Sequence, residues 1–194
     1  MCGIIGYSGA EYAREKLLHG LENLEYRGYD SAGIALWDEG KIEVIKAAGR
    51  LSNLRAACGD QCLASHCGIG HTRWATHGEP NDINSHPHVS QNGKIALVHN
   101  GIIENYLEIR EFLEEKGVQF ASETDSEVVA QLLEYCLGLD EVHCMQDAIY
   151  MVLHRIEGAY AFGIVCADDP ERIYAARKDA PLLLGYGDGE NFIA

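Results

Sequence analysis

Cys2 is the residue of this sequence that is best placed to do chemistry. It follows the initiator methionine and begins an apolar run over residues 2–6. Removal of Met1 would leave a thiol and a free α-amine on one residue. The thiolate is the reactive form of cysteine, and an α-amine, with a pKa of about 7.7–8.0, can accept the thiol proton at neutral pH. The sequence thus predicts a nucleophile and its base at Cys2. The alternative is a buried structural cysteine.

Four polar clusters could hold the substrate of such a nucleophile. They cover residues 25–33, 71–78, 99–101 and 122–125. Each lies at an end of an expected strand or helix, where a scaffold displays groups to a ligand.

An attack on an amide places negative charge on the carbonyl oxygen, which then needs preorganised donors. Asn100 offers a side-chain amide and Gly101 a backbone N–H that can approach a ligand closely. An ordinary Asn-Gly turn is the competing interpretation. For an α-amino acid amide, Arg73 could clamp the carboxylate and Asp125 could pair with the ammonium. Taken alone, each residue is better explained by a structural role, Arg73 in a surface ion pair and Asp125 as an acid near a helix N-terminus.

Histidines crowd the same region and leave two alternatives open. They are His71, His77, His86, His88 and His99. A papain-like Cys-His pair is one alternative, although it gives the nucleophile no advantage from its place at position 2. A metal site is the other.

The candidate metal ligands have unfavourable spacing. They are Cys58, Cys62 and Cys67 with His66 and His71, and separately His86 with His88. Zinc sites show tight, paired ligand spacing, and neither set has a matching second pair. We therefore expect no metal and no cofactor.

Composition limits the class of protein. Thirty acidic residues against fifteen basic ones give a formal charge of −15, which disfavours binding to nucleic acid or to an anionic membrane. No signal peptide or membrane-spanning apolar run is visible. Seven cysteines, an odd number, favour reduced thiols and a cytoplasmic location.

Hydrophobic spacing predicts a mixture of helices and antiparallel hairpins. Strands are expected over residues 2–7, 33–37, 41–47, 68–72, 95–99, 159–166, 172–176 and 182–187, and helices over 11–25, 50–58, 102–116, 124–137 and 146–155. Thr124 and Glu127 have the spacing of a capping box. The polar stretch 73–92 has little periodicity, and long loops of this kind are usually functional.

Taken together, these clusters resemble the glutaminase domain of the glucosamine-6-phosphate synthase family. That domain is a class II glutamine amidotransferase of the N-terminal-nucleophile hydrolase superfamily. The opening Cys-Gly-Ile is shared across class II amidotransferases, whereas the other matches are similar to this family in particular. These are residues 25–33, 73–78, 98–105, 122–125 and 191–194, and the resemblance covers essentially all 194 residues.

The resemblance implies catalytic roles. Cys2 would be the nucleophile, with its own α-amine as the base once Met1 is removed. Asn100 and the backbone N–H of Gly101 would form the oxyanion hole.

It also implies a glutamine pocket. Arg73 would bind the glutamine carboxylate and Asp125 the ammonium. Further residues would shape or border this pocket: Trp74, Thr76, His77, His86 and Arg27. Residues 74–82 resemble a loop that closes over glutamine.

The implied fold is α+β, a four-layer αββα sandwich of two antiparallel sheets. Residues 1–194 would form one glutaminase domain that is truncated at its C-terminal end and lacks the sugar-isomerase domains. The full enzyme, a homo-oligomer, would transfer ammonia from glutamine to fructose 6-phosphate and make glucosamine 6-phosphate.

Two other functions compete with this expectation. One is an amidophosphoribosyltransferase-like glutaminase, against which the string over residues 72–77 argues. The other is a noncatalytic module that binds glutamine. A chain that retains Met1 would lack the base and is expected to be weak or inactive.

Overall fold

The computed structural model describes residues 2–59, 64–74 and 81–194. Its strands are β1 (Gly3–Gly9), β2 (Ser31–Asp38), β3 (Lys41–Ala48), β4 (Cys67–Arg73), β5 (His88–Val89), β6 (Ile95–Ile103), β7 (Gly158–Cys166), β8 (Asp169–Lys178), β9 (Leu184–Tyr186) and β10 (Glu190–Ile193). Its helices are α1 (Ala13–Leu24), the 3-10 turn η1 (Glu25–Arg27), α2 (Leu51–Cys58), α3 (Tyr106–Glu115), α4 (Asp125–Leu137) and α5 (Met145–Arg155).

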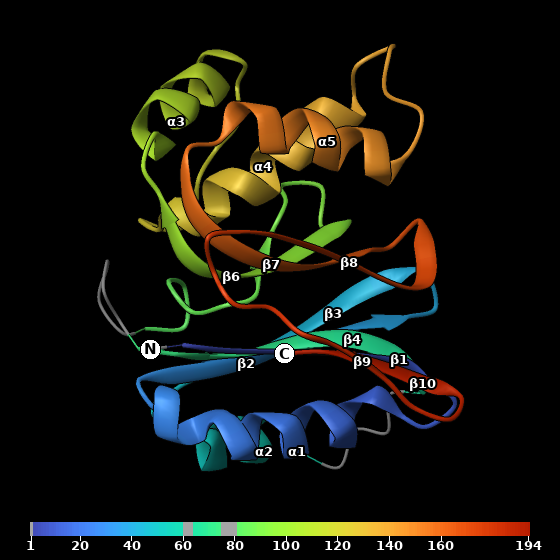
Figure 1. Cartoon of the computed structure of the whole chain (residues 1–194). Helices are drawn as coiled ribbons and strands as arrows, with labels where there is room; N and C mark the ends of the chain where they lie inside the picture. Colours follow the sequence, from blue (N-terminus) through green and yellow to red (C-terminus); the bar gives the residue numbers. More distant parts are fainter. Residues whose placement is uncertain (1, 60–63, 75–80) are drawn as a thin grey trace.

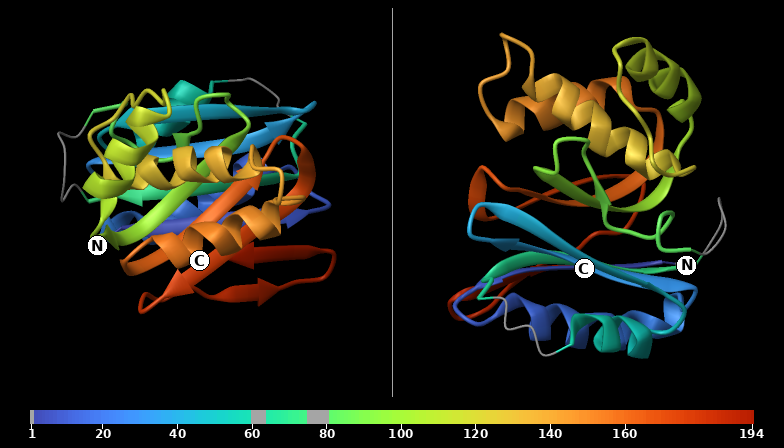
Figure 2. Two further views of the ribbon diagram at one scale, coloured as in Figure 1. Left: turned by 90° about the horizontal axis from the view of Figure 1, so that it is seen from above. Right: turned by 180° about the vertical axis from the view of Figure 1, so that it is seen from behind.

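The described elements form four layers (Figure 1). The larger sheet has the order β3-β2-β4-β1-β10-β9 and the smaller one β5-β6-β7-β8. Helices α1 and α2 cover the outer face of the larger sheet, and α3, α4 and α5 cover the outer face of the smaller one, as Figure 2 also shows from behind. All paired strands within the two sheets are antiparallel, so the expected αββα sandwich is confirmed.

Three hydrophobic cores hold the layers together. Side chains such as Ile4, Ile69 and Val98 fill the space between the two sheets. Leu17 and Leu21 of α1 pack against the larger sheet. The smaller sheet packs its other face on α3, α4 and α5. Both sheets are thus apolar on both faces, and the polar residues of the site lie at the ends of the strands.

The register of β1 brings Cys2 to such an end. Gly3 pairs with Thr72 of β4, so Cys2 lies beyond the paired residues and next to the end of β4 at Arg73. On the other side of β4, Ser31 of β2 pairs with Arg73. Gly28 lies close by, and a Cβ there would come within 2.7 Å of the Arg73 carbonyl carbon, so only glycine allows this approach.

The largest errors in the expected boundaries are at the end of β6 and the start of α3. The strand expected over residues 95–99 continues to Ile103, and the helix expected from residue 102 begins only at Tyr106. The physical reason is tertiary pairing, since residues 100–103 pair with residues 158–161 of β7. Asn100 and Gly101 therefore belong to a strand and not to a turn.

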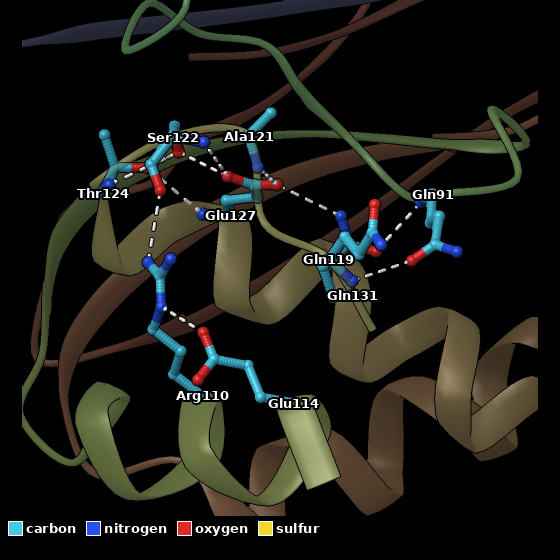
Figure 3. Close-up of polar contacts among 9 residues, drawn as sticks. All are labelled: Gln91, Arg110, Glu114, Gln119, Ala121, Ser122, Thr124, Glu127 and Gln131. Carbon is cyan, nitrogen blue, oxygen red and sulfur yellow. Dashed lines mark hydrogen bonds and ion pairs between the residues drawn. The ribbon is translucent and has the colours of Figure 1, made fainter. Parts of the chain in front are cut away.

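The N-terminus of α4 forms only half of the expected capping box. Thr124 Oγ1 accepts from the Glu127 backbone N–H at 3.3 Å, as predicted. The Glu127 carboxylate reaches further back and accepts from the backbone N–H groups of Ala121 and Ser122 at 2.9 and 2.6 Å (Figure 3). This network fixes the first turn of α4, which carries Asp125.

None of the helices in the described ranges combines the length and apolarity that a bilayer crossing needs.

Candidate active site

Cys2 is half-buried, and its sulfur is close to the main chain of Trp74. The Trp74 backbone N–H donates to Sγ at 3.3 Å, and Sγ lies 3.6 Å from the Trp74 carbonyl oxygen. A thiol can donate to that carbonyl, and the N–H can stabilise a thiolate. The environment therefore accommodates both protonation states of the sulfur.

Asn100 and Gly101 lie beside Cys2, on β6 of the other sheet. Asn100 Nδ2 donates to the Cys2 carbonyl oxygen at 3.3 Å. Gly101 has φ +134°, and a Cβ there would collide with the Ala159 carbonyl oxygen. The position therefore requires glycine, which brings the backbone of β6 close to Cys2.

One cavity brings together most of the predicted residues. It is lined by Cys2, Arg73, Trp74, His86, His99, Gly101, Thr124, Asp125 and Ser126. These residues come from the ends of β1, β4 and β6, from the segment before β5, and from the first turn of α4. Residues from five segments far apart in sequence thus converge on one small space.

The cavity holds opposite charges. Arg73 is buried, and burial lowers the pKa of its guanidinium, while the negative charges of Cys2, Asp30 and Asp125 raise it. Asp125 is held in place because one carboxylate oxygen accepts from the Ile103 backbone N–H at 2.8 Å. A cation and an anion beside the thiol suit a zwitterionic ligand.

Arg27 borders Cys2 at a second cavity. Its lining comprises Cys2, Arg27, Asn100, Gly101, Ile102, Ala180 and Pro181. Ile102, Ala180 and Pro181 make one wall apolar. The predicted residues are therefore divided between two spaces that share Cys2 and Gly101.

Four histidines, His71, His86, His88 and His99, are buried and uncharged. Burial lowers the pKa of His71 to about 3 and that of His99 to about 4, and lowers the pKa values of His86 and His88 well below the usual range. Among the described residues, no histidine ring nitrogen hydrogen-bonds to the sulfur of Cys2. The geometry therefore gives no support to a papain-like pair within these residues.

Two predicted pocket residues, Thr76 and His77, lie outside the described residues, as does Cys62 of the candidate metal cluster. In the described ranges, no three His, Cys, Asp or Glu side chains are arranged to hold a metal ion. Cys58 and Cys67 are instead buried in separate hydrophobic cores.

Sequence reasoning did not assign three residues that line the main cavity, namely His99, Thr124 and Ser126. Each is adjacent in sequence to Asn100 or Asp125. His99 and Thr124 belong to the polar clusters 99–101 and 122–125, and Ser126 directly follows the second cluster, but polarity alone does not say which way a side chain points.

The family model described as a glutamine amidotransferase domain matches residues 71–194. The chain is 59% identical over its full length to the glutamine–fructose-6-phosphate aminotransferase (isomerizing) of Caldanaerobacter subterraneus, and covers 31% of that protein. It is 52% identical, again over its full length, to the enzyme of the same name from Pyrococcus horikoshii and covers 32% of it. The chain therefore spans about a third of the length of these curated relatives.

Solved structures agree with the sequence matches. The glutamine phosphoribosylpyrophosphate amidotransferase of Bacillus subtilis superposes with a TM-score of 0.83 at 28% identity, covering all of this chain and 41% of that one. A class-II glutamine aminotransferase domain protein from Silicibacter pomeroyi, at 17% identity and a TM-score of 0.58, shares the fold.

Proposed function

Because the chain belongs to the glutamine amidotransferase domain family, we propose that its cavity binds glutamine and that Cys2 cleaves the side-chain amide. The observation that carries this proposal is the meeting of Cys2, Arg73 and Asp125 in one cavity. The arginine can pair with the α-carboxylate through two parallel hydrogen bonds, and Asp125 can pair with the α-ammonium. Trp74, His86 and His99 then form walls of the pocket.

The reaction proceeds in two halves. The thiol proton passes to the α-amine as sulfur attacks the amide carbon, and the carbonyl oxygen becomes an oxyanion. The C–N bond then breaks, the leaving NH₂ group takes that proton and departs as ammonia, and a thioester remains. Water then attacks the thioester, which releases glutamate and restores the thiol. Asn100 Nδ2 and the Gly101 N–H are the donors for the oxyanion. Their closeness to Cys2 supports this assignment.

The α-amine of Cys2 is the proposed general base. It becomes available only when Met1 is removed, and it titrates near neutral pH. The neutral buried histidines of the described site leave this role to the amine. Material that retains Met1 is therefore expected to be inactive.

In the full-length protein, we propose that ammonia passes to fructose 6-phosphate to give glucosamine 6-phosphate. The support is the name of the relatives that are 59% and 52% identical over the whole chain. Residues 1–194 would be the glutaminase part, and further domains would bind the sugar phosphate. We also propose a cytoplasmic location, because none of the described cysteines forms a disulfide bond and reduced thiols are typical of that compartment.

Glutaminase assays of the full-length protein test the proposal. Cys2→Ala should lower the rate of ammonia release by at least about 10³-fold, because the covalent step is lost. Cys144→Ala is the matched control, because Cys144 is an exposed free cysteine outside the cavity. Equal turnover in Cys2→Ala and the unaltered enzyme would rule the proposal out. If both proteins bind glutamine and neither releases ammonia, the domain is instead a noncatalytic module that binds glutamine.

A further inference from the structure

The side-chain amide of Asn100 has two chemically different ends, and only one of them can stabilise an oxyanion. The Nδ2 group donates hydrogen bonds, whereas Oδ1 only accepts them. A rotation of about 180° around the last side-chain bond exchanges the two ends. Whatever fixes that rotation decides whether the residue can act as the proposed donor.

His71 makes the contact that fixes it. Its Nε2 lies 3.1 Å from the backbone carbonyl oxygen of His99 and 3.0 Å from Asn100 Oδ1. A backbone carbonyl can only accept, so Nε2 must carry the hydrogen. The Asn100 atom that faces the same N–H must then be an acceptor, which is Oδ1.

The other end of the amide is consistent with this assignment. Nδ2 lies 3.3 Å from the carbonyl oxygen of Cys2, which also only accepts. Two backbone carbonyls, neither of which can be flipped, thus determine one orientation of the amide. That orientation places the NH₂ group beside the nucleophile.

We propose that His71 is a positioning residue that holds the Asn100 amide with its NH₂ group toward the oxyanion. This inference rests on the proposed function, in which Asn100 stabilises the oxyanion. His71 itself does not line either cavity that contains Cys2. It acts through Asn100.

The surroundings keep His71 in one place and in one protonation state. Its backbone pairs with β1 at Ile4 and with β2 at Gly33, and its ring packs on His86 with centroids 4.1 Å apart. Burial lowers the pKa of the ring to about 3, and the nearby positive charge of Arg73 acts in the same direction. The ring is therefore a neutral, fixed hydrogen-bond donor throughout the working pH range.

The test uses the full-length, Met1-processed enzyme and a double-mutant cycle. His71→Leu removes the donor and should lower the glutaminase kcat by about 10- to 100-fold, up to the loss seen when an oxyanion donor is deleted. The KM for glutamine should change by less than about threefold, because Arg73 and Asp125 are untouched. His71→Gln can place an amide N–H near the position of Nε2 and should recover much of the lost rate.

The decisive comparison introduces His71→Leu into an enzyme that already carries Asn100→Ala. If His71 acts only through the Asn100 amide, then His71→Leu has no further effect on kcat once that amide is gone. Multiplicative losses in the double variant would overturn the inference, because they would show that His71 acts independently. The pH dependence of kcat in His71→Leu should keep its shape, whereas loss of an ionisation would mean that His71 is a base.

Alkylation of Cys2 by iodoacetamide separates the remaining explanations, because this reaction forms no oxyanion. The rate should be the same in His71→Leu and the unaltered enzyme. If the alkylation rate falls as much as the turnover, then His71 supports the reactivity of Cys2 or the stability of the fold, and the inference is overturned. Failure of the proposed function would look different, since Cys2→Ala would then retain turnover.

Discussion

The Trp74 backbone N–H donates to the sulfur of Cys2 at 3.3 Å. The donor follows the last residue of β4, and the sulfur precedes the first residue of β1. The two strands pair up to Gly3 and Thr72, so the ends of neighbouring strands bring donor and sulfur together. A main-chain group is thereby available to stabilise a thiolate.

Replacement of Trp74 by proline puts a ring carbon in place of the amide hydrogen and so removes both the donor and its contact with the sulfur, whereas replacement by alanine keeps them. Arg73 lies at the end of a strand, a conformation that is compatible with a following proline. A hydrogen bond to a charged group contributes about 1.5 kcal/mol or more, so the rate of Cys2 alkylation by iodoacetamide should fall at least about tenfold in Trp74→Pro. Trp74→Ala is the control and should react at the normal rate. Equal rates in the two variants would show that the N–H does not activate the sulfur.

Gly101→Ala should destabilise the fold as well as the site. A Cβ at this position collides with the Ala159 carbonyl oxygen, and φ is +134°. Gly93→Ala is the matched control, since Gly93 has φ +75° but nothing within 4 Å of a Cβ. Denaturant titration should show a loss of about 1 kcal/mol for Gly93→Ala and a clearly larger loss for Gly101→Ala. Similar losses would mean that β6 can move away from β7 at this point.

The buried histidines make the domain labile to acid. Burial lowers the pKa values of His71, His86, His88 and His99 below the value of about 6.5 that holds in the unfolded chain. Between pH 6.5 and about 4, the unfolded state therefore binds more protons than the folded state. The free energy of unfolding should be highest above pH 6.5 and should fall below it, by up to about 1.4 kcal/mol per pH unit for each histidine.

Denaturant titrations at pH 7, 6 and 5 measure this dependence. His88→Gln removes one of the buried rings and should make the slope below pH 6.5 shallower. His19→Gln should leave the slope unchanged, because the His19 side chain is 76% exposed. The explanation fails if both variants keep the slope of the unaltered protein.

The buried carboxylate of Glu127 stabilises the segment that leads into α4. It accepts from the Ala121 and Ser122 backbone N–H groups and from the Ser122 hydroxyl, the last at 2.6 Å. Glu127→Gln places an NH₂ group against these donors and should lower the free energy of unfolding by about 1–3 kcal/mol. Figure 3 also shows Glu114, whose ion pair with Arg110 is more exposed. Glu114→Gln should change stability by less than about 0.5 kcal/mol, and an equal effect of the two substitutions would refute the role of Glu127.

Periodicity located the α-helices and most of the described strands, because the alternation and the apolar helix faces are local properties, but it missed the short strands β5 and β10. It could not locate the end of β6 or the start of α3. Residues 100–103 remain extended because they pair with residues 158–161, a contact between segments more than fifty positions apart in the sequence. Likewise, the spacing of Thr124 and Glu127 predicted the cap, but the carboxylate found closer partners in the preceding loop.

The site shows the same limit. The resemblance of the polar clusters to a known family assigned Cys2, Arg73 and Asp125 to an amide-cleaving pocket, yet their convergence depends on the register of β1 with β4 and on the packing of α4 against β6. The orienting contact of His71 was not predictable at all. It depends on which ring nitrogen faces the His99 carbonyl oxygen, and no spacing rule reports that direction.

The sulfur of Cys2 is the proposed nucleophile toward glutamine. The most direct test is mass spectrometry of the full-length, Met1-processed enzyme after reaction with an electrophilic glutamine analogue. We predict stoichiometric labelling of the N-terminal peptide at Cys2, protection by excess glutamine, and loss of glutaminase activity in step with labelling. Loss of activity while Cys2 stays unmodified would show that Cys2 is not the nucleophile. Full labelling of Cys2 with activity retained would show the same.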